Sequence, residues 1–405
     1  MLHRATRMES PTFLRERRGS GARASTDVLC LSHLRWGFVY QRPNHLMSRC
    51  AREHRVFFVE EPIFDADAPR LEVFEAQPSL QVVVPHLPPG RSLGAVDVML
   101  SELVDGLVAR ERMRSPLLWL YTPMAVPFAK ELDRAAVVYD CMDELSLFHG
   151  APPELVQRER DLFAMADVVF TGGHGLWEKK KEHHPNVHAF PSSVDAAHFG
   201  KARGTLEEPS DQRSVPHPRL GFFGVLDERF DIPLIRESAR ARPDWHFILV
   251  GPVVKIDPAT LPALPNIHYL GPKSYDELPS YLAGWDVAIM PFARNESTRY
   301  ISPTKTLEYL AAGKPVVSTS IRDVVRTFAD KKLVRIADRA DHFVAEITQA
   351  LSQRGTPLEE AWRTAVDDLL SQTSWDRTWA RMHALIERAI SRRRTNREEA
   401  PCSII

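Results

Sequence analysis

The sequence predicts two α/β domains, each built on a doubly wound parallel β-sheet, that face each other across a cleft. Short continuous apolar runs, such as DVLCLS at 27–32 and PLLWLYTP at 116–123, indicate strands that are buried on both faces. Helical stretches alternate with these runs, which is typical of a parallel sheet covered by helices. A polar, proline-rich segment at 201–218 divides the series in two, as an interdomain linker does.

Composition limits the class of protein. The chain has 405 residues, 44% of them hydrophobic, which is enough for two separate cores, and its formal net charge of −1 disfavours nucleic acid as a partner. The four cysteines are widely spaced and match no zinc or disulfide framework, which indicates a reducing compartment. No apolar run approaches the roughly 20 residues that span a bilayer, so we expect a cytoplasmic protein.

Residues 1–25 carry six arginines and little apolar periodicity, and we expect a disordered basic tail. A solvated tail is one interpretation. A weak attraction to anionic lipid is the other, and it would place the protein peripherally at the inner face of the cell membrane. This contact matters only if a substrate is membrane-bound.

The first domain is expected over residues 26–200. Its predicted strands lie within 27–32, 55–62, 80–88, 116–123, 136–144 and 167–173, and its predicted helices at 43–52, 96–110 and 154–166.

The second domain is expected over 219–374, after the linker at 201–218. Its predicted strands lie within 219–224, 245–252, 266–271, 286–292, 315–319 and 333–337, with helices at 233–242, 275–283 and 357–371. A final helix at 375–393 is expected to brace the two domains, before a tail at 394–405. Because open α/β sheets bind ligands at the carboxyl ends of their strands, we expect the site where the two sheets face each other.

The stretch 299–317, RYISPTKTLEYLAAGKPVV, combines a helix start with two opposite charges. Ser302 is a good N-cap and Pro303 a good first helical residue, so the helix should begin there and offer an anion site to which Lys305 adds a charge. Glu308 lies three residues on, on the face of Lys305, where a carboxylate can accept hydrogen bonds from vicinal hydroxyls. An ordinary surface pair of Lys305 and Glu308 is the alternative.

Four stretches, taken together, resemble the GT-B glycosyltransferases of group 1 (family 4) and their relatives in bacterial polysaccharide and teichuronic-acid synthesis. They are FPSSVDAAHF at 190–199, NIHYLGPKSYDELPSYLAGWDVAIMPF at 266–292, KTLEYLAAGKPVV at 305–317 and SWDRTWARMHALI at 374–386. The resemblance covers most of residues 190–390. It implies that the second domain binds a nucleoside-diphosphate sugar, the donor, and that the first domain binds the acceptor.

The resemblance also implies roles for residues of the second domain. Glu308 would bind the ribose, while Lys305 and the helix start from Ser302 to Thr304 would bind the diphosphate of a UDP- or GDP-sugar. Arg229, in the turn 221–231, would be a second cation, or it would simply pair with Asp227 or Asp231. Tyr275 would stack on the base, or it would only cap a helix.

One position departs from the family pattern. Retaining family 4 enzymes carry a second glutamate eight residues before the ribose-binding one, and that position is Tyr300 here. The nearest glutamate is Glu296, which would need a shifted loop. The stereochemistry of transfer, retaining or inverting, therefore stays open.

The first domain supplies the candidates for chemistry. An inverting transfer needs a general base near the acceptor oxygen, and Asp140, Asp143 and Glu144 follow an apolar strand end. We expect Asp140 or Asp143 to be the base; the alternative is that one caps the next helix and the other is a solvated loop charge.

The loop 33–44, HLRWGFVYQRPN, follows the first strand and should meet the acceptor or the donor phosphates through His33, Trp36 and Arg42. Trp36 could instead be a packing aromatic. The histidines in KEHHPNVH at 181–188 have no acidic partner, so we expect no metal site there and no obligatory metal for transfer.

The sequence therefore predicts a glycosyltransferase of bacterial polysaccharide or cell-envelope glycan synthesis, acting on a saccharide or lipid-linked acceptor. The alternatives are a sugar-nucleotide epimerase or hydrolase on the same fold, and a non-catalytic scaffold protein with that fold.

Overall fold

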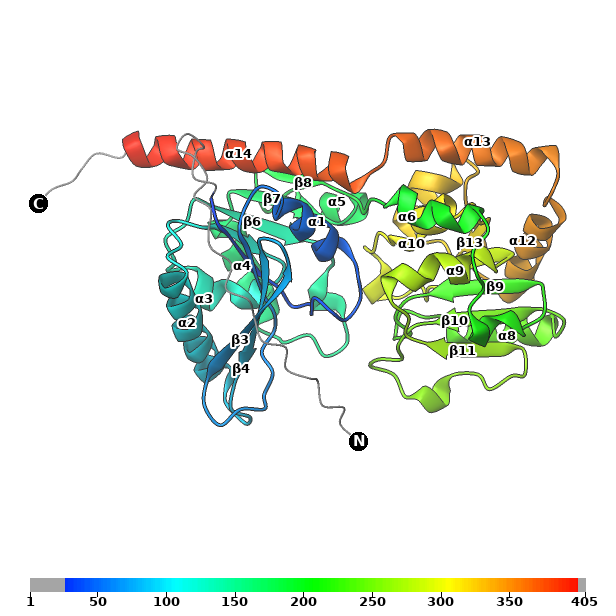
Figure 1. The fold of residues 1–405 in the computed structure, drawn as a ribbon, viewed down its shortest axis with the longest axis horizontal. Helices are drawn as coiled ribbons and strands as arrows, with labels where there is room; N and C mark the ends of the chain where they lie inside the picture. The colour runs from blue at the N-terminus through cyan, green and yellow to red at the C-terminus, as the bar shows by residue number, and fades with distance from the viewer. Residues whose placement is uncertain (1–25, 400–405) are drawn as a thin grey trace, which may run out of the picture.

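The computed structural model describes residues 26–399, which form two α/β domains lying side by side (Figure 1). The predicted basic tail at 1–25 and the final residues 400–405 lie outside the described residues. Within 26–399, no helix combines the length and the apolarity that crossing a membrane requires.

The first domain contains an eight-stranded sheet, which is parallel except at one edge. In spatial order its strands are β3 (Arg70–Gln77), β4 (Leu80–His86), β2 (Val56–Val59), β1 (Val28–Leu31), β5 (Leu117–Leu120), β6 (Ala136–Cys141), β7 (Val168–Thr171) and β8 (Val187–Ala189). The strands β1, β2 and β5 to β7 are buried along their whole length, as the continuous apolar runs predicted.

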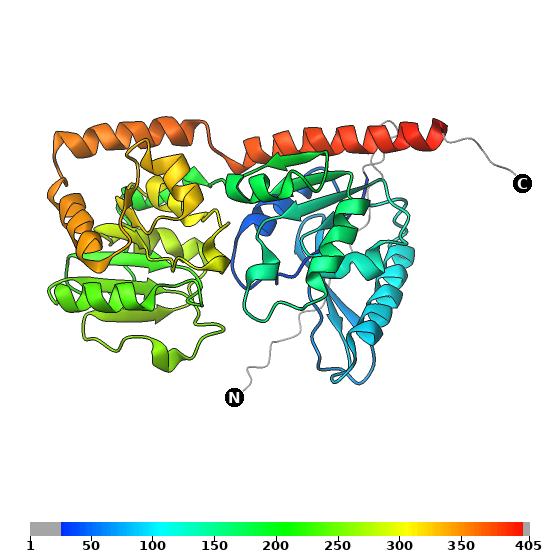
Figure 2. The same cartoon turned by 180° about the vertical axis from the view of Figure 1, so that it is seen from behind.

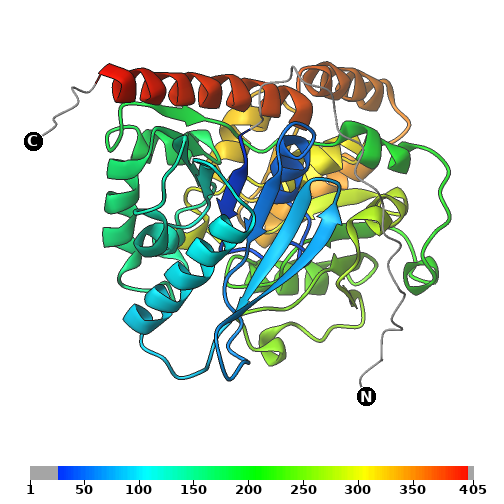
Figure 3. The ribbon, with the colours of Figure 1, turned by 60° about the vertical axis from the view of Figure 1, so that its left-hand side comes forward.

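The edge strand β3 was not predicted. It runs antiparallel to β4 and alternates exposed with half-buried residues, because only one of its faces meets the domain (Figure 3). The two strands are joined by a tight turn at Pro78 and Ser79, where Ser79 adopts a φ of +65°. β8 was missed because it has only three residues, all half-buried.

Helices cover both faces of the first sheet. They are α1 (Arg42–Cys50), α2 (Leu93–Arg110), α3 (Val126–Ala129), α4 (Leu155–Met165) and α5 (His174–Lys180). The expected helices at 43–52, 96–110 and 154–166 are confirmed as α1, α2 and α4. Ser92 caps α2 by accepting a hydrogen bond from the Ala95 N–H.

The second domain has a fully parallel six-stranded sheet. Its strands, in spatial order, are β11 (Ile267–Gly271), β10 (His246–Val250), β9 (Arg219–Phe223), β12 (Val287–Met290), β13 (Val316–Ser318) and β14 (Arg335–Ile336). Its helices are α6 (Ala196–Gly200), α7 (Ser210–Arg213), α8 (Ile232–Ala241), α9 (Leu278–Ala283), α10 (Lys305–Ala311), α11 (Arg322–Val324), α12 (Ala340–Ser352) and α13 (Pro357–Ser371).

The predicted linker at 201–218 is wrong, because the chain passes between the domains earlier. Phe190 packs in the core of the first domain, whereas Val194 and Phe199 already belong to the core of the second. Within 201–218, Gln212 is fully buried and accepts a hydrogen bond from the Trp285 indole. The segment is polar because it lies on the surface of the second domain.

The last helix, α14 (Trp375–Glu399), returns to the first domain and runs along its outer side, next to α13 on the second (Figure 2). Trp375, Trp379, Met382 and Ile386 fill the core of the first domain. The helix extends six residues beyond the predicted end at 393, so the expected tail at 394–405 is wrong up to Glu399.

The two domains also touch directly. Asp323 of α11 accepts hydrogen bonds from the backbone N–H groups of His174 and Gly175, at 2.9 Å each, and so caps α5 of the first domain. Arg322 and Arg326 pair with Glu178 of the same helix. The second domain thus supplies the N-terminal cap of a helix in the first.

Candidate active site between the two domains

The carboxyl ends of both sheets point to the region where the domains meet. In the first sheet, Leu31 of β1 pairs with Leu120 of β5, which in turn pairs with Tyr139 of β6. The residues that follow β1 and β6 therefore leave the sheet at one edge. In the second sheet Phe223 of β9 pairs with Val250 of β10, so the turns after these strands also share an edge.

Helix α10 holds the carboxylate of Glu308 in a buried position. Tyr309 is fully buried and its hydroxyl accepts a hydrogen bond from the Phe223 N–H at 2.9 Å, which fixes the rotation of the helix against β9. Glu308 is only 6% exposed, and its Oε2 has no hydrogen-bond partner among the described residues. Burial raises the pKa of Glu308 to about 7, against the lowering effect of the Lys305 charge.

Lys305 lies one turn before Glu308 and passes over Gly224, at the end of β9. A Cβ atom on Gly224 would lie 2.2 Å from the Lys305 Cε, and the φ of +144° at Gly224 suits only glycine. Burial lowers the pKa of Lys305, while the Glu308 carboxylate raises it. Within residues 26–399 the ammonium group has no ion-pair partner.

The start of α10 differs from the prediction. The helix begins at Lys305, and Thr304, already in the α conformation, accepts backbone hydrogen bonds from Leu307 and Glu308. Ser302 therefore does not cap the helix, and Pro303 precedes it. The Ser302 Cβ would lie 2.8 Å from a Cβ added to Gly173, so Ser302 packs against the first domain.

Arg229 also lies at this edge, and it pairs with Asp227, as the alternative reading allowed. Its Nε and Nη2 donate to the Asp227 carboxylate, with the shortest contact at 2.6 Å. Nη1 makes no hydrogen bond to any of the described residues. Asp231 has a separate role, since it caps α8 by accepting from the Leu234 N–H.

Tyr275 is held by other aromatic rings, so the expected base stacking is wrong. Its ring stacks on His198, with centroids 4.2 Å apart, and lies 4.4 Å from the ring of Tyr40 of the first domain. The Tyr275 hydroxyl is buried without a hydrogen-bond partner among the described residues. Burial, and next the Glu308 carboxylate, raise the pKa of Tyr275.

Asp140 and Arg42 form an ion pair inside the first domain. The guanidinium donates three hydrogen bonds to the Asp140 carboxylate, at 2.8 to 3.1 Å, and its Nη1 donates to the Phe190 carbonyl at 2.7 Å. Arg42 is 1% exposed and Asp140 is fully buried. Neither the base role expected of Asp140 nor the phosphate contact expected of Arg42 fits this geometry, because both groups are satisfied in the core.

Asp143 is placed differently. It is half-buried, and its carboxylate accepts no hydrogen bond from any of the described residues. Burial raises the pKa of Asp143 to about 6, while Arg229, Arg42 and Lys305 act in the opposite direction. Arg229 and Lys305 belong to the second domain, so cations of that domain lie close enough to Asp143 to lower the pKa of its carboxyl group.

His33, just after β1, reaches the same region. Its Nδ1 is buried without a hydrogen-bond partner among residues 26–399. Burial, together with the charge of Lys255 in the second domain, lowers the pKa of His33 to about 4, although a hydrogen bond with the Tyr121 backbone acts in the opposite direction. The imidazole is therefore neutral and can accept or donate one hydrogen bond to a ligand.

Two other candidates have structural roles. The Trp36 ring packs on Phe58 with centroids 5.2 Å apart, and its backbone N–H donates to Glu60. This fits the packing alternative for Trp36. Glu144 is buried and pairs with Lys179 and Lys180 at 2.9 and 2.8 Å.

Known proteins resemble this chain in sequence and in fold. Residues 218–353 match the family model described as glycosyl transferases group 1. A Bacillus subtilis (strain 168) protein named "Putative teichuronic acid biosynthesis glycosyltransferase TuaH" is 26% identical over 306 residues, which cover 69% of this chain and 72% of that protein. The chain has the GT-B fold, and its second domain matches the group 1 glycosyl transferases.

Solved structures support the fold of this glycosyltransferase. Sucrose-phosphate synthase from Thermosynechococcus elongatus is similar with a TM-score of 0.69 at 14% identity, covering 90% of this chain and 99% of that one. The Anabaena protein HepE in complex with UDP and glucose has a TM-score of 0.62 at 15% identity, with 89% and 99% covered. The predicted GT-B fold is confirmed.

The structure also shows what lies at Tyr300, the position where a second glutamate was expected, and at Glu296, the nearest glutamate. Tyr300 packs against the first domain, with the Lys179 ammonium 4.9 Å from its ring centroid. Glu296 has an exposed side chain and pairs with Arg299 at 3.5 Å. Neither residue brings a second carboxylate to Glu308.

Sequence reasoning missed two residues of this glycosyltransferase. Phe148 of the first domain lies beneath two cations of the second, with the Arg229 guanidinium 5.4 Å and the Lys255 ammonium 5.7 Å from its ring centroid. Lys255 follows β10, so the rule that ligands bind at strand ends could have found it. No sequence pattern pointed to Phe148, because it lies in an irregular loop.

Proposed function

We propose that this glycosyltransferase moves a sugar from a UDP- or GDP-sugar to a hydroxyl group of a saccharide or lipid-linked acceptor. The observation that carries the proposal is the Oε2 of Glu308, a buried carboxylate oxygen one turn from Lys305 that has no hydrogen-bond partner within residues 26–399. A buried carboxylate without a partner is strongly unfavourable unless a ligand supplies donors. Two ribose hydroxyls are such donors.

The diphosphate of the donor would bind next to Glu308. Lys305 lies on the same face of α10 as Glu308. Arg229, in the turn after β9, donates to Asp227 through Nε and Nη2, so its Nη1 can donate to a phosphate. Two cations can neutralise the charge that develops on a leaving diphosphate. We propose that they supply the charge that a metal ion supplies in other transferases, so that transfer needs no obligatory metal.

Asp143 is the proposed general base. Its carboxylate takes the proton of the acceptor hydroxyl as the acceptor oxygen bonds to the anomeric carbon. The bond from that carbon to the diphosphate oxygen breaks at the same time, and the nucleoside diphosphate leaves with the electron pair. The Asp143 carboxylate accepts no hydrogen bond from residues 26–399, it feels the charges of Arg229 and Lys305, and its pKa of about 6 is near the working range of a base. His33 would orient the acceptor hydroxyl.

Relatives support the substrate classes. The Anabaena protein HepE binds UDP and glucose, and an E. coli trehalose-6-phosphate structure is bound with UDP-2-fluoro glucose. The name of the B. subtilis relative supports an acceptor in cell-envelope polysaccharide synthesis. If that acceptor is lipid-linked, we propose that the enzyme works at the cytoplasmic face of the membrane.

The test is a thermal-shift panel with UDP, GDP, ADP, TDP and NAD on the wild type and on Glu308→Ala. A nucleotide at about 100 times its dissociation constant adds about 2.7 kcal/mol to the stability of the domain that binds it. One nucleoside diphosphate should raise Tm by several degrees, and Glu308→Ala should lose that shift. Glu296→Ala is the matched control, because that glutamate is exposed and outside the site.

Two outcomes contradict the proposal. An equal shift in Glu308→Ala and wild type would remove the ribose assignment. Turnover of the nucleotide sugar at full rate without any acceptor would favour the hydrolase or epimerase alternative.

A further inference from the structure

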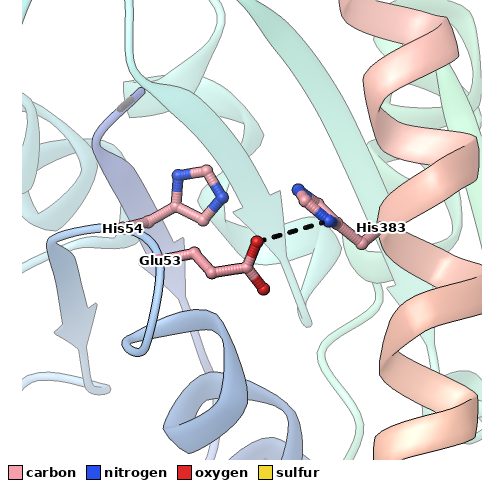
Figure 4. Close-up of side chains that lie close together, drawn as sticks. All are labelled: Glu53, His54 and His383. Carbon is pink, nitrogen blue, oxygen red and sulfur yellow. Dashed lines mark ion pairs between the residues drawn. The ribbon is translucent and has the colours of Figure 1, made fainter. Parts of the chain in front are cut away.

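Three side chains with metal-binding atoms lie together on the outer side of the first domain, away from the edge that holds Lys305 and Glu308. Glu53 and His54 follow α1, and His383 lies on α14 (Figure 4). One ligand atom from each residue lies within 4.8 Å of the other two. Figure 4 shows a ring nitrogen of His54 and the Glu53 carboxylate pointing toward His383.

His54 and Glu53 each make a hydrogen bond through their other polar atom, whereas His383 Nε2 has only a longer contact and no hydrogen-bond partner among the described residues. His54 Nδ1 lies 2.9 Å from the Thr26 carbonyl, so the proton is on Nδ1 and the lone pair on Nε2. The Glu53 Oε1 accepts a hydrogen bond from the Trp379 indole at 3.1 Å. His383 Nε2 lies 3.5 Å from the Glu387 carboxylate, while its Nδ1 faces Glu53 Oε2 at 3.8 Å.

This arrangement is the one found around metal ligands. Ligating histidines donate their other N–H to a carbonyl or a carboxylate, and ligating carboxylates are hydrogen-bonded in turn. Here the outer contacts leave His54 Nε2, His383 Nδ1 and Glu53 Oε2 available to an ion, and one ligand atom from each residue lies within 4.8 Å of the other two. We propose that these three atoms bind a divalent transition-metal ion, Zn²⁺ being the ion that two imidazoles and one carboxylate suit best.

The distances require a small adjustment. Bonds of about 2.0–2.1 Å at tetrahedral angles place ligand atoms roughly 3.3 Å apart, so the three atoms must close in from 4.8 Å or less. Glu53 can do this, because about half of its side chain is exposed. Water would take the fourth position, which lies toward solvent.

The ion would fasten α14 to the first domain. The same two elements are already joined by Arg49 and Arg52, which both pair with Asp376 at the start of α14. His383 lies two turns further along, so the ion would hold the helix at a second point. The site is structural, independent of the donor site and of the proposed transfer chemistry.

The experiment is a zinc titration of the full chain, freed of metal with a chelator, by calorimetry and by thermal shift. Zn²⁺ at about 100 times its dissociation constant should raise Tm by several degrees. His54→Ala and His383→Ala should each weaken Zn²⁺ binding at least tenfold and abolish that shift. His342→Ala is the matched control, because this exposed histidine lies on α12 of the second domain.

Glu53→Gln provides a variant that keeps the acceptor for Trp379 and removes the ligand charge, in case a histidine variant is poorly folded. It should also weaken binding tenfold or more, while UDP or GDP binding stays unchanged. The proposal is overturned if wild type shows no Zn²⁺-dependent shift. It is equally overturned if His54→Ala, His383→Ala and Glu53→Gln bind Zn²⁺ as tightly as His342→Ala.

Discussion

Replacing Asp140 by alanine should strongly lower the thermal stability of the first domain, because Asp140 is the ion-pair partner of the buried Arg42. The change leaves the Arg42 guanidinium, 1% exposed, with the Phe190 carbonyl as its one remaining hydrogen-bond partner among the described residues. Removing one partner of a buried ion pair costs about 3–5 kcal/mol, because the remaining charge is buried without compensation. At roughly 2–4 °C per kcal/mol, Tm should fall by about 6–20 °C.

The assay is thermal unfolding followed by circular dichroism, with the transition of the first domain compared between variants. Asp143→Ala is the matched control three residues along the chain. Its carboxylate has no partner among the described residues, and burial raises its pKa, so losing it should change the unfolding free energy by less than about 1 kcal/mol. A double variant, Arg42→Met with Asp140→Leu, should recover most of the stability, because apolar replacements remove both charges.

The reasoning is refuted if Asp140→Ala unfolds at the temperature of the wild type. If Asp140→Ala keeps full stability but loses transfer, the structural role that we assign to Asp140 is wrong. This outcome would return Asp140 to the role of general base.

Two further predictions concern the reaction. Transfer by the wild type should fall about tenfold per pH unit as pH drops below about 6, because burial raises the pKa of Asp143 to that value and a general base must be ionised. Asp143→Asn should slow transfer by about 10²–10⁴ and remove this acid limb of the pH profile. Full activity in the variant would exclude Asp143 as the base. Gly224→Ala should weaken UDP or GDP binding at least tenfold in a calorimetric titration, since the new Cβ would displace Lys305. Gly355→Ala, at a positive φ of +69° but with no atom within 4 Å of the new Cβ, should bind normally, and equal affinities of the two variants would disprove the role of Gly224.

Much of the fold followed from the sequence, because buried parallel strands are continuous apolar runs. All six predicted strands of the second domain occur, and the helix at 357–371 has the bounds of α13. The edge strand β3 was missed because one of its faces is exposed, so it lacks such a run. The domain boundary was misplaced because polar composition resembles a linker, even where Gln212 is buried against Trp285.

The candidate site could be predicted only in part. Motif residues on regular elements, Lys305 and Glu308 on α10, lie together because helical spacing is fixed. The choice between Asp140 and Asp143 could not be made, because it depends on whether Arg42 from a distant segment reaches one carboxylate. Tyr275 illustrates the same limit, since His198 and Tyr40 approach it from remote parts of the chain.

The return of α14 has a consequence for synthesis. Domains generally fold as units while the chain leaves the ribosome, the N-terminal one first. Here the first domain needs Trp375 and Trp379 in its core, and these residues are made after the second domain. The second domain, from Val194 to Val366, is contiguous and can finish while the first still lacks that helix. The N-terminal half of this enzyme therefore completes its core only after the C-terminal half has been made.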